Sequence, residues 1–595
     1  MQHPAPPKPA AQSAWVAAVA FFASLGLLAA PIEITRLLAM MGIPIVFAAF
    51  MIFRPASNAR WWALSATSAN LLLSLKLMAD FFASPPAGGG FSMIFAREIV
   101  PEIGFSFSLG LDAVSVLLIA LTALLGPVCV LGSWNAIRRR QRLFYGWLLL
   151  LQTAMYGVFA ARDLLVFYIS FEFTLLPLFV LINEFGSSDR RRAAVKFFLY
   201  TFTGSIIALV GLLFVAFHAA SRPEIGVFTL DIGLLAEAAR TMPASAQALV
   251  MLAMLAGFAV KVPLFPVHTW LPLAHTEAPT AGSVILAGVL LKLGTYAIYR
   301  FVLPFTPEAA FDYAPYIAVL SIIGIVYAGL VCWVQNDVKK LVAYSSVSHL
   351  GFCVLGLFAM NSIGLTGSVL YMINHGLSTG ALFLLIGFMY ERYHTRDLRQ
   401  LGGLASKMPV WSFFMVFFVM ASVGLPGLNG FVSEFMTMMG TFQSDSALVD
   451  SQPGATFGPL GPWYAFAAAT GVIVAAIYLL TMLAKIVWGP LREPPGHADG
   501  HAEDDGAAGA LPRDVTTAHE LIPLTALAAL CLLFGLYPKP LIVALEPPIN
   551  AQVASIRSAI ELSVPNVPDG VERQVVGPVN GEAAPAASGR VGESE

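Results

Sequence analysis

The stretch 258–280, FAVKVPLFPVHTWLPLAHTEAPT, decides how this chain is built. It closes a long apolar run with Lys261, and Pro263 and a second proline follow within five residues. Proline removes a backbone donor and clashes with the preceding turn, so a helix through this stretch has to break or kink. The next apolar run, 281–302, carries Lys292 near its middle. Runs of this length cross a bilayer, where a charge is costly, so the stretch predicts membrane helices with buried charges and a break.

Composition supports a polytopic α-helical membrane protein. Of 595 residues, 58% are hydrophobic and 11% are charged, against about 25% charged in soluble domains. Mean hydropathy is +0.77. A net charge of −2 gives no reason to expect nucleic-acid binding. We expect no metal or redox cofactor within this chain, because it has no CxxC spacing, Cys/His cluster or Gly-rich nucleotide loop in a suitable context.

Apolar periodicity predicts about fifteen membrane spans. They are 14–33, 36–53, 61–83, 110–134, 143–160, 162–185, 196–219, 246–270, 279–302, 312–334, 341–361, 365–390, 409–440, 462–487 and 520–545. The first is either an extra helix or a cleaved signal sequence. We favour the extra helix, because a signal peptide has a stronger positive region before its apolar run.

The basic residues of the loops alternate with the spans. Counted from 36 onward, five basic clusters fall on one side of the membrane, at Arg54/Arg60, Arg138–Arg142, Arg190–Lys196, Lys339/Lys340 and Arg392–Lys407. The intervening loops, 84–109, 220–245 and 441–461, are poor in Lys and Arg. The positive-inside rule makes the basic side cytoplasmic.

A second interrupted span divides the chain into units. Residues 421–435, ASVGLPGLNGFVSEF, contain Pro426 among glycines. Paired interrupted spans are typical of transporters with inverted repeats. We therefore expect two five-span units, 143–302 and 312–487, inserted in opposite senses. The other segments are N-terminal helices within 1–142, a flexible cytoplasmic loop at 488–519, a C-terminal helix at 520–545 and a polar tail at 546–595.

Three charges inside apolar spans are candidates for ion movement. Glu172 lies in 163–185, Lys261 in 251–270 and Lys292 in 281–302. Burial disfavours the charged ammonium and a nearby carboxylate favours it, so a shift of Glu172 relative to Lys261 would switch proton binding. Glu172 and Lys261 are alternatively a structural ion pair, and Lys292 alternatively snorkels to an interface.

Further titratable groups continue the path into the second unit. His349 and His375 suit a proton relay because the unperturbed pKa of histidine is near neutral, and Glu434 would be the terminal carboxylate. The alternatives are that each histidine only bonds a neighbouring helix and that Glu434 caps its broken helix.

Other polar residues have simpler interpretations. His268, His275 and Glu277 lie near a helix end, where we expect them to structure a loop or interface. Asp112 is expected to cap the start of its span. His497 and His501 are in a Pro/Gly-rich stretch, where a solvated linker is expected rather than a metal site.

Six ordered strings resemble the antiporter-like subunits of respiratory complex I, and within that family the subunit M branch, called subunit 4 in mitochondria. They are FYISFEFTLLPLFVLI (167–182), AAVKFFLYTFTGS (193–205), FAVKVPLFPVHTWLP (258–272), AHTEAPTAGSVILAGVLLKLGTY (274–296), QNDVKKLVAYSSVSHLGF (335–352) and GLPGLNGFVSEF (424–435). Glu434, where the sister subunits usually carry lysine, and the stretch 391–404 are similar to subunit M in particular. Leu273 departs from the family's pattern, as do the additional 14–33 and 488–519.

The resemblance implies a core of fourteen helices with two inverted repeats and a broken helix in each. It also implies that Glu172 and Lys261 are a coupled pair, Lys292 the central relay, His349 and His375 polar-axis residues, and Glu434 the terminal carboxylate. NADH, FMN, iron–sulfur clusters and quinone would then belong to partner subunits, and other membrane subunits and the bilayer would be this chain's partners.

Four functions fit these expectations. The leading one is a proton-translocating, non-redox membrane subunit of an NADH-quinone oxidoreductase in a bacterial cytoplasmic membrane. The alternatives are a subunit of a multi-chain cation/proton antiporter, a subunit of a membrane-bound hydrogenase or formate-oxidising complex, and a scaffold whose buried charges no longer conduct.

Overall fold

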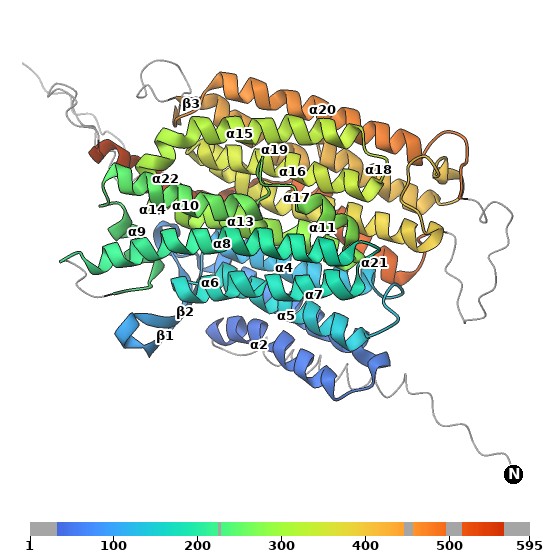
Figure 1. The fold of residues 1–595 in the computed structure, drawn as a ribbon, viewed down its shortest axis with the longest axis horizontal. Coiled ribbons are helices and arrows are strands. Elements are labelled where there is room, and N and C mark those ends of the chain that lie inside the picture. Colours follow the sequence, from blue (N-terminus) through green and yellow to red (C-terminus); the bar gives the residue numbers. More distant parts are fainter. Residues whose placement is uncertain (1–32, 224–227, 446–455, 495–513, 564–595) are drawn as a thin grey trace, which may run out of the picture.

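The structure, a computed structural model, describes residues 33–223, 228–445, 456–494 and 514–563. The helices range from three to 32 residues, and the long ones lie side by side along the molecule (Figure 1). In the first half they are α2 (Glu33–Ile52), α3 (Ala59–Ala83), α4 (Ala113–Gly132), α5 (Gln141–Ala160), α6 (Leu164–Phe173), α7 (Leu175–Phe185), α8 (Arg190–Ala220), α9 (Ile232–Ala239), α10 (Ala244–Lys261), α11 (Leu271–Glu277), α12 (Thr280–Ile285), α13 (Leu291–Ala297) and α14 (Leu303–Phe305). In the second half they are α15 (Pro307–Trp333), α16 (Val338–Phe358), α17 (Ser362–Tyr393), α18 (Pro409–Val423), α19 (Asn429–Gln443), α20 (Pro462–Ile486), α21 (Ala518–Leu536) and α22 (Lys539–Ser563).

The helical membrane architecture expected from the sequence is confirmed. Among the described residues, 12 helical segments are long and apolar enough to cross a membrane. Two further expected spans are present in less apolar or interrupted form. They are α3, whose 25 residues suffice for a bilayer core of about 30 Å, and the pair α18 and α19. The span expected at 14–33 lies outside the described residues.

A central group of helices is buried on every side. It consists of the segment 280–305 and α17, whose most apolar windows are wholly buried, with α16 almost as enclosed. The peripheral helices α8, α15 and α20 expose large apolar side chains along one face. Side chains of the central group therefore face other helices rather than lipid, which is where a membrane protein keeps its polar groups.

Both interruptions that the prolines predict are present. α10 ends at Lys261, Pro263 has a φ of +35°, and regular helix resumes only at Leu271. The second break separates α18 from α19 and contains Gly424 with a φ of +82°. Backbone groups freed at membrane depth need partners within the protein.

Two asparagines provide such partners at the second break. The Asn374 Nδ2 on α17 donates to the Asn429 carbonyl at 2.8 Å, and the Asn429 Nδ2 donates back to the Asn374 carbonyl at 3.2 Å. Both residues are buried. This reciprocal pair holds the broken helix against the most enclosed helix of the bundle.

Hydropathy alone did not predict two other irregularities. The span 162–185 is divided at Thr174 into α6 and α7, and the segment 280–305 contains two π-helical turns, η5 (Leu286–Leu290) and η6 (Ile298–Val302). Single π-turns inside α-helices are frequent at functional sites. Here η5 directly precedes Lys292.

The loop 84–109 and the C-terminus differ from the expectation. An antiparallel hairpin joins β1 (Ser92–Val100) to β2 (Phe105–Leu111). A second, two-residue pairing joins β3 (Ser444–Asp445) to β4 (Thr456–Phe457). The helix expected over 520–545 ends at Leu536, and α22 continues to Ser563 through residues expected to form a polar tail.

The basic clusters gather at one end of the bundle. Arg140, before α5, pairs with Glu184 on α7 at 2.5 Å, and Arg392 on α17 pairs with Glu520 on α21 at 2.9 Å. The hairpin and α9 lie at the opposite end (Figure 1). We call the first the basic end. The parts of the 488–519 loop that contain His497 and His501 lie outside the described residues.

Candidate functional site

Lys261 occupies the C-terminal position of α10, directly before the proline break. Its Nζ donates to the Phe171 carbonyl at 3.1 Å and to the Thr174 Oγ1 at 3.2 Å, and it lies 3.7 Å from the centroid of the Phe171 ring. The Phe171 carbonyl is reachable because the chain is irregular where α6 gives way to α7. The junction at Thr174 therefore supplies the immediate partners of this buried lysine.

Glu172 lies one residue from these partners but does not pair with Lys261. Among the described residues, its carboxylate has no ion-pair partner within 4.0 Å, and its buried oxygens make no hydrogen bond of ordinary geometry, although the Ser205 side chain on α8 is near enough to interact with them. The structural ion pair considered as an alternative is therefore absent from this conformation.

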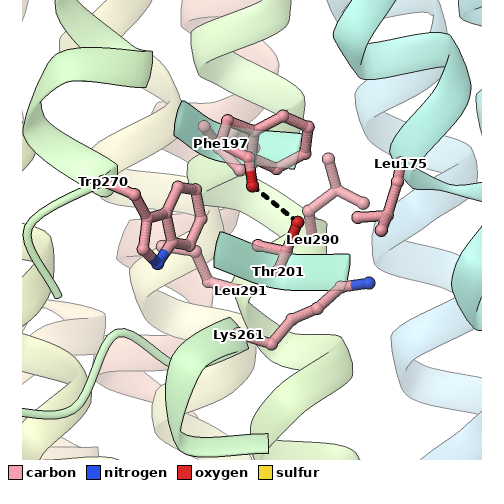
Figure 2. A pocket seen from close by; sticks show the side chains of 8 residues that line it. Leu175, Phe197, Thr201, Lys261, Trp270, Leu290 and Leu291 are labelled. Atoms are coloured by element: carbon pink, nitrogen blue, oxygen red, sulfur yellow. Dashed lines mark hydrogen bonds between the residues drawn. The ribbon is translucent and has the colours of Figure 1, made fainter. Parts of the chain in front are cut away.

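A small cavity lies beside Lys261. It has about 10 Å³ of room for the centre of a water molecule, close to what one water needs. Figure 2 shows Lys261 among its lining, which is otherwise mostly apolar. Leu286, Leu290 and Leu291, which precede Lys292 in the chain, form part of the wall, and Lys292 itself does not line the cavity.

Lys292 is completely buried in α13. Its Nζ lies 2.7 Å from the His375 Nδ1 on α17 and donates to the Ala287 carbonyl of the preceding π-turn. The side chain is 0% exposed, which contradicts the alternative that it snorkels to an interface. When Lys292 is an ammonium, the Nδ1 of His375 has to be the acceptor, and the imidazole is then neutral with its proton on Nε2. The buried Nε2 has no hydrogen-bond partner.

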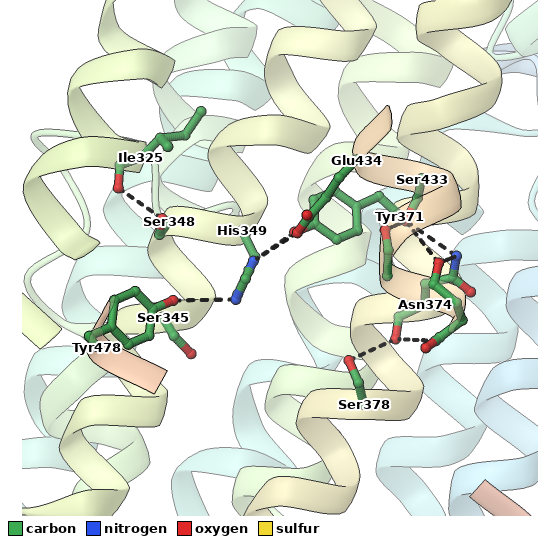
Figure 3. Close-up of polar contacts among 12 residues, drawn as sticks. Ile325, Ser345, Ser348, His349, Tyr371, Asn374, Ser378, Ser433, Glu434 and Tyr478 are labelled. Atoms are coloured by element: carbon green, nitrogen blue, oxygen red, sulfur yellow. Dashed lines mark hydrogen bonds and ion pairs between the residues drawn. The ribbon is translucent and has the colours of Figure 1, made fainter. Parts of the chain in front are cut away.

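The second histidine continues the polar contacts towards the second break. The ring of His349 on α16 lies 5.8 Å from that of His375, centroid to centroid. Its Nδ1 is 2.6 Å from the Tyr371 hydroxyl and 3.6 Å from the Glu434 Oε1, and the Tyr371 hydroxyl donates to the same Glu434 oxygen. Figure 3 shows His349 between Glu434 and Tyr478, whose hydroxyl is 3.4 Å from the His349 Nε2.

Glu434 does not act as a helix cap in this conformation. Its side chain makes no capping hydrogen bond to the start of α19 among the described residues. The Oε2 instead lies against Gly424, where a Cβ atom would come within 2.5 Å of it. The carboxylate is therefore packed against the backbone of the break while it accepts from Tyr371.

Five of the six candidate residues thus form two groups, and the small cavity borders the first of them at Lys261. Lys261 is bound at the α6/α7 junction, whereas Lys292, His375, His349 and Glu434 form a chain of close contacts from α13 to α19. Glu172 is near the first group without bonding to it.

The residues given simpler interpretations have mixed outcomes. The Glu277 Oε2 accepts from the Asp189 backbone N–H at 2.9 Å, so it structures the 186–189 turn as expected. The Asp112 Oδ1 caps α4 by accepting from the Ser115 N–H at 2.8 Å. His275 differs, because it is fully buried against Phe383 with neither ring nitrogen bonded. His268 is also buried, and its Nδ1 has no partner.

Sequence reasoning missed Tyr371 and Thr174. Tyr371 precedes His375 by four residues, so the two share one face of α17, and that spacing is a signal from which Tyr371 was predictable. Thr174 had no comparable signal, because a threonine in an apolar span more often bonds its own helix. Its Oγ1 does also donate to the Phe171 carbonyl, at 2.7 Å.

No group of three or more His, Cys, Asp or Glu side chains suitable for a metal is present within the described ranges. The four cysteines are free and buried, at positions Cys129, Cys332, Cys353 and Cys531.

Comparison with known proteins agrees with this arrangement. The family described as NADH:quinone oxidoreductase/Mrp antiporter, TM matches residues 161–450. NADH-quinone oxidoreductase subunit M of Rhodobacter capsulatus is 39% identical over 485 residues, which cover 81% of this chain and 88% of the relative. The chain belongs to the subunit M family of NADH-quinone oxidoreductase.

Solved structures also match the fold of this chain. A chain of respiratory complex I from Thermus thermophilus with bound NADH superposes with a TM-score of 0.74 at 29% identity, covering 88% of this chain and 99% of that one. A chain of the Mrp complex from Dietzia sp. DQ12-45-1b reaches a TM-score of 0.72 at 22% identity, covering 89% of this chain and 100% of that one. The second likeness shows a shared fold only.

Proposed function

We propose that this chain is a proton-translocating membrane subunit of an NADH-quinone oxidoreductase, with the path running through Glu172, Lys261, Lys292, His375, His349 and Glu434. The observation that carries the proposal is the contact between Lys292 and His375, 2.7 Å apart and both buried. A purely structural role for Lys292 would not require its ammonium to lie against the His375 imidazole at the centre of the bundle.

Each member of the path has a proton-handling part. Lys292 gives a proton to the His375 Nδ1, and the unbonded Nε2 of that ring releases one towards His349 through a water. His349 and the Tyr371 hydroxyl then deliver it to Glu434. On the other side, a water in the cavity would connect Lys261 with Lys292, and Glu172 would set the charge of Lys261 by approaching or withdrawing.

The driving force comes from outside this chain. Moving one elementary charge across 100 mV requires about 2.3 kcal/mol, so the path needs coupling to an exergonic reaction. The family membership supports electron transfer in partner subunits that hold NADH, FMN, iron–sulfur clusters and quinone, with no cofactor in this chain. We assign the protein to a bacterial cytoplasmic membrane, with the basic end inside and with inverted repeats over 143–302 and 312–487.

The test is Lys292→Ala in the complete complex, reconstituted into liposomes. We expect NADH-driven proton uptake per electron to fall at least about fivefold, while subunit composition is retained. Lys76→Ala is the matched control, because Lys76 pairs with Asp80 on exposed α3 far from the path in sequence. Undiminished pumping in an assembled Lys292→Ala complex would overturn the proposal, and loss of assembly in this variant alone would favour the scaffold function.

A further inference from the structure

A second cavity lies at the end of the bundle opposite the basic end, and it is lined by three arginines. Its volume is about 290 Å³, and Arg162, Arg240 and Arg300 contribute to its wall. α22 closes one side through Pro548, Gln552 and Ser555. None of these residues belongs to the proton path proposed above.

The charges around this arginine cavity do not cancel. Arg300 forms a close ion pair with Asp112, and Arg162 approaches Asp231 at 3.9 Å. Arg240 has no carboxylate within 4.0 Å among the described residues, and its Nε makes only a 3.5 Å contact with a backbone carbonyl. The residues that line the cavity thus carry three guanidinium groups and one carboxylate, that of Asp112, while Asp231 and Glu237 are near it but outside its lining.

Arginine geometry around the cavity is fixed rather than flexible. The guanidinium of Arg300 lies 4.9 Å from the centroid of the Phe91 ring, and that of Arg162 lies 5.3 Å from the same centroid. Ring contacts and ion pairs hold both groups in place before any ligand arrives. Partial burial lowers the pKa of Arg240, because the guanidinium loses hydration and the nearby Glu237 carboxylate offsets that loss only in part.

α22 adds an unused polar group to the wall. The Ser555 Oγ is buried and has no hydrogen-bond partner. Gln552 is fixed, because its Nε2 donates to the Tyr299 carbonyl at 2.7 Å. Buried polar groups are normally bonded, so an unpartnered hydroxyl facing a positive cavity points to a missing acceptor.

We propose that this arginine cavity binds one phosphate-bearing anion, either the headgroup of an anionic phospholipid or free phosphate. Guanidinium groups bind phosphate oxygens through paired N–H donors, and Arg240 has no direct ion pair among the described residues that would compete for those donors. The ligand would bridge α9, the segment 298–304 and α22, and so would fasten α22 to the bundle. The inference does not depend on the proton path.

The test compares anion binding by the assembled complex and its variants. A photoactivatable phosphatidylglycerol is incorporated into phosphatidylcholine nanodiscs that hold the complex, and cross-linked peptides are mapped by mass spectrometry. Radiolabelled inorganic phosphate is measured on the same samples by equilibrium dialysis. Arg240→Gln is the cavity variant, and Arg97→Gln, on exposed β1 at the same end, is the matched control.

We expect cross-links in peptides 232–240 and 548–556, or one bound phosphate, and a loss of roughly tenfold or more in Arg240→Gln alone. Ser555→Glu, which places a carboxylate where the ligand would be, should abolish binding while retaining assembly. Lipid cross-links without phosphate binding identify a headgroup, and phosphate binding identifies free phosphate. Absence of both, or equal binding in Arg240→Gln and Arg97→Gln, would overturn the proposal.

Discussion

At the scale of single residues, Lys292 differs from Lys261 in the kind of partner that its ammonium meets. Lys261 bonds a carbonyl and a hydroxyl, neither of which accepts a proton at ordinary pH. Lys292 bonds a carbonyl and an imidazole nitrogen, and the imidazole nitrogen accepts a proton near neutral pH. A proton that reaches Lys292 therefore has an acceptor in direct contact, whereas transfer from Lys261 requires an intervening water.

Tyr371 gives a sharp test of the far end of the path. Tyr371→Phe removes the hydroxyl that bonds both His349 and Glu434. Each of these buried groups then lacks one hydrogen-bond partner, which costs about 1–3 kcal/mol in stability. We expect proton uptake per electron to fall in liposomes while the complex assembles. Tyr390→Phe is the control, because Tyr390 is on the same helix with an exposed ring. Equal pumping by the two variants would remove Tyr371 from the path.

At the scale of elements, the two broken helices place charged residues beside irregular backbone. Lys261 ends α10 at one break, and Glu434 packs against Gly424 at the other. Irregular backbone at membrane depth offers unpaired polar groups that an intact helix keeps to itself. The hydrogen-bond partners of both charges nevertheless come from other helices, from the α6/α7 junction for Lys261 and from Tyr371 on α17 for Glu434.

Alanine substitutions at two glycines of the second break distinguish the effect of backbone strain from the effect of displacing Glu434. Gly424 and Gly427 have φ values of +82° and +92°, so alanine at either costs roughly 1–2 kcal/mol. A Cβ at Gly424 would lie 2.5 Å from the Glu434 Oε2, whereas at Gly427 its nearest neighbour is 3.8 Å away.

We expect Gly424→Ala and Gly427→Ala to lower the thermal unfolding midpoint of the complex similarly, with pumping lost in Gly424→Ala only. Equal pumping in the two variants would show that the position of Glu434 does not matter.

At the scale of the whole molecule, α22 fastens the end opposite the basic one. Ile549 and Leu545 are fully buried against the bundle, and the Ser362 hydroxyl on α17 bonds the Asn550 side chain at 2.6 Å. The helix therefore connects the last membrane span to the start of the most enclosed one.

Ile549→Asp tests this attachment, because it buries a charge without a partner. We expect a loss of about 3 kcal/mol or more, seen as a lower unfolding midpoint and less assembled complex. Ala554→Asp, at an exposed position of the same helix, should be nearly neutral. If both substitutions behaved alike, the packing of α22 would not contribute to stability.

The sequence by itself determined the membrane class, the positions of most spans, the end at which basic residues gather, both helix breaks and which spans carry charges. These features follow from hydropathy, charge and proline sterics, which act over one turn or one span. Only the tertiary structure decided which charges meet. Lys292 and His375 are 83 residues apart and Tyr371 and Glu434 are 63 apart, and such contacts depend on how each helix is rotated and packed. The same reason explains why α22 was expected as a tail: its few apolar residues gain nothing until the bundle provides a surface to cover.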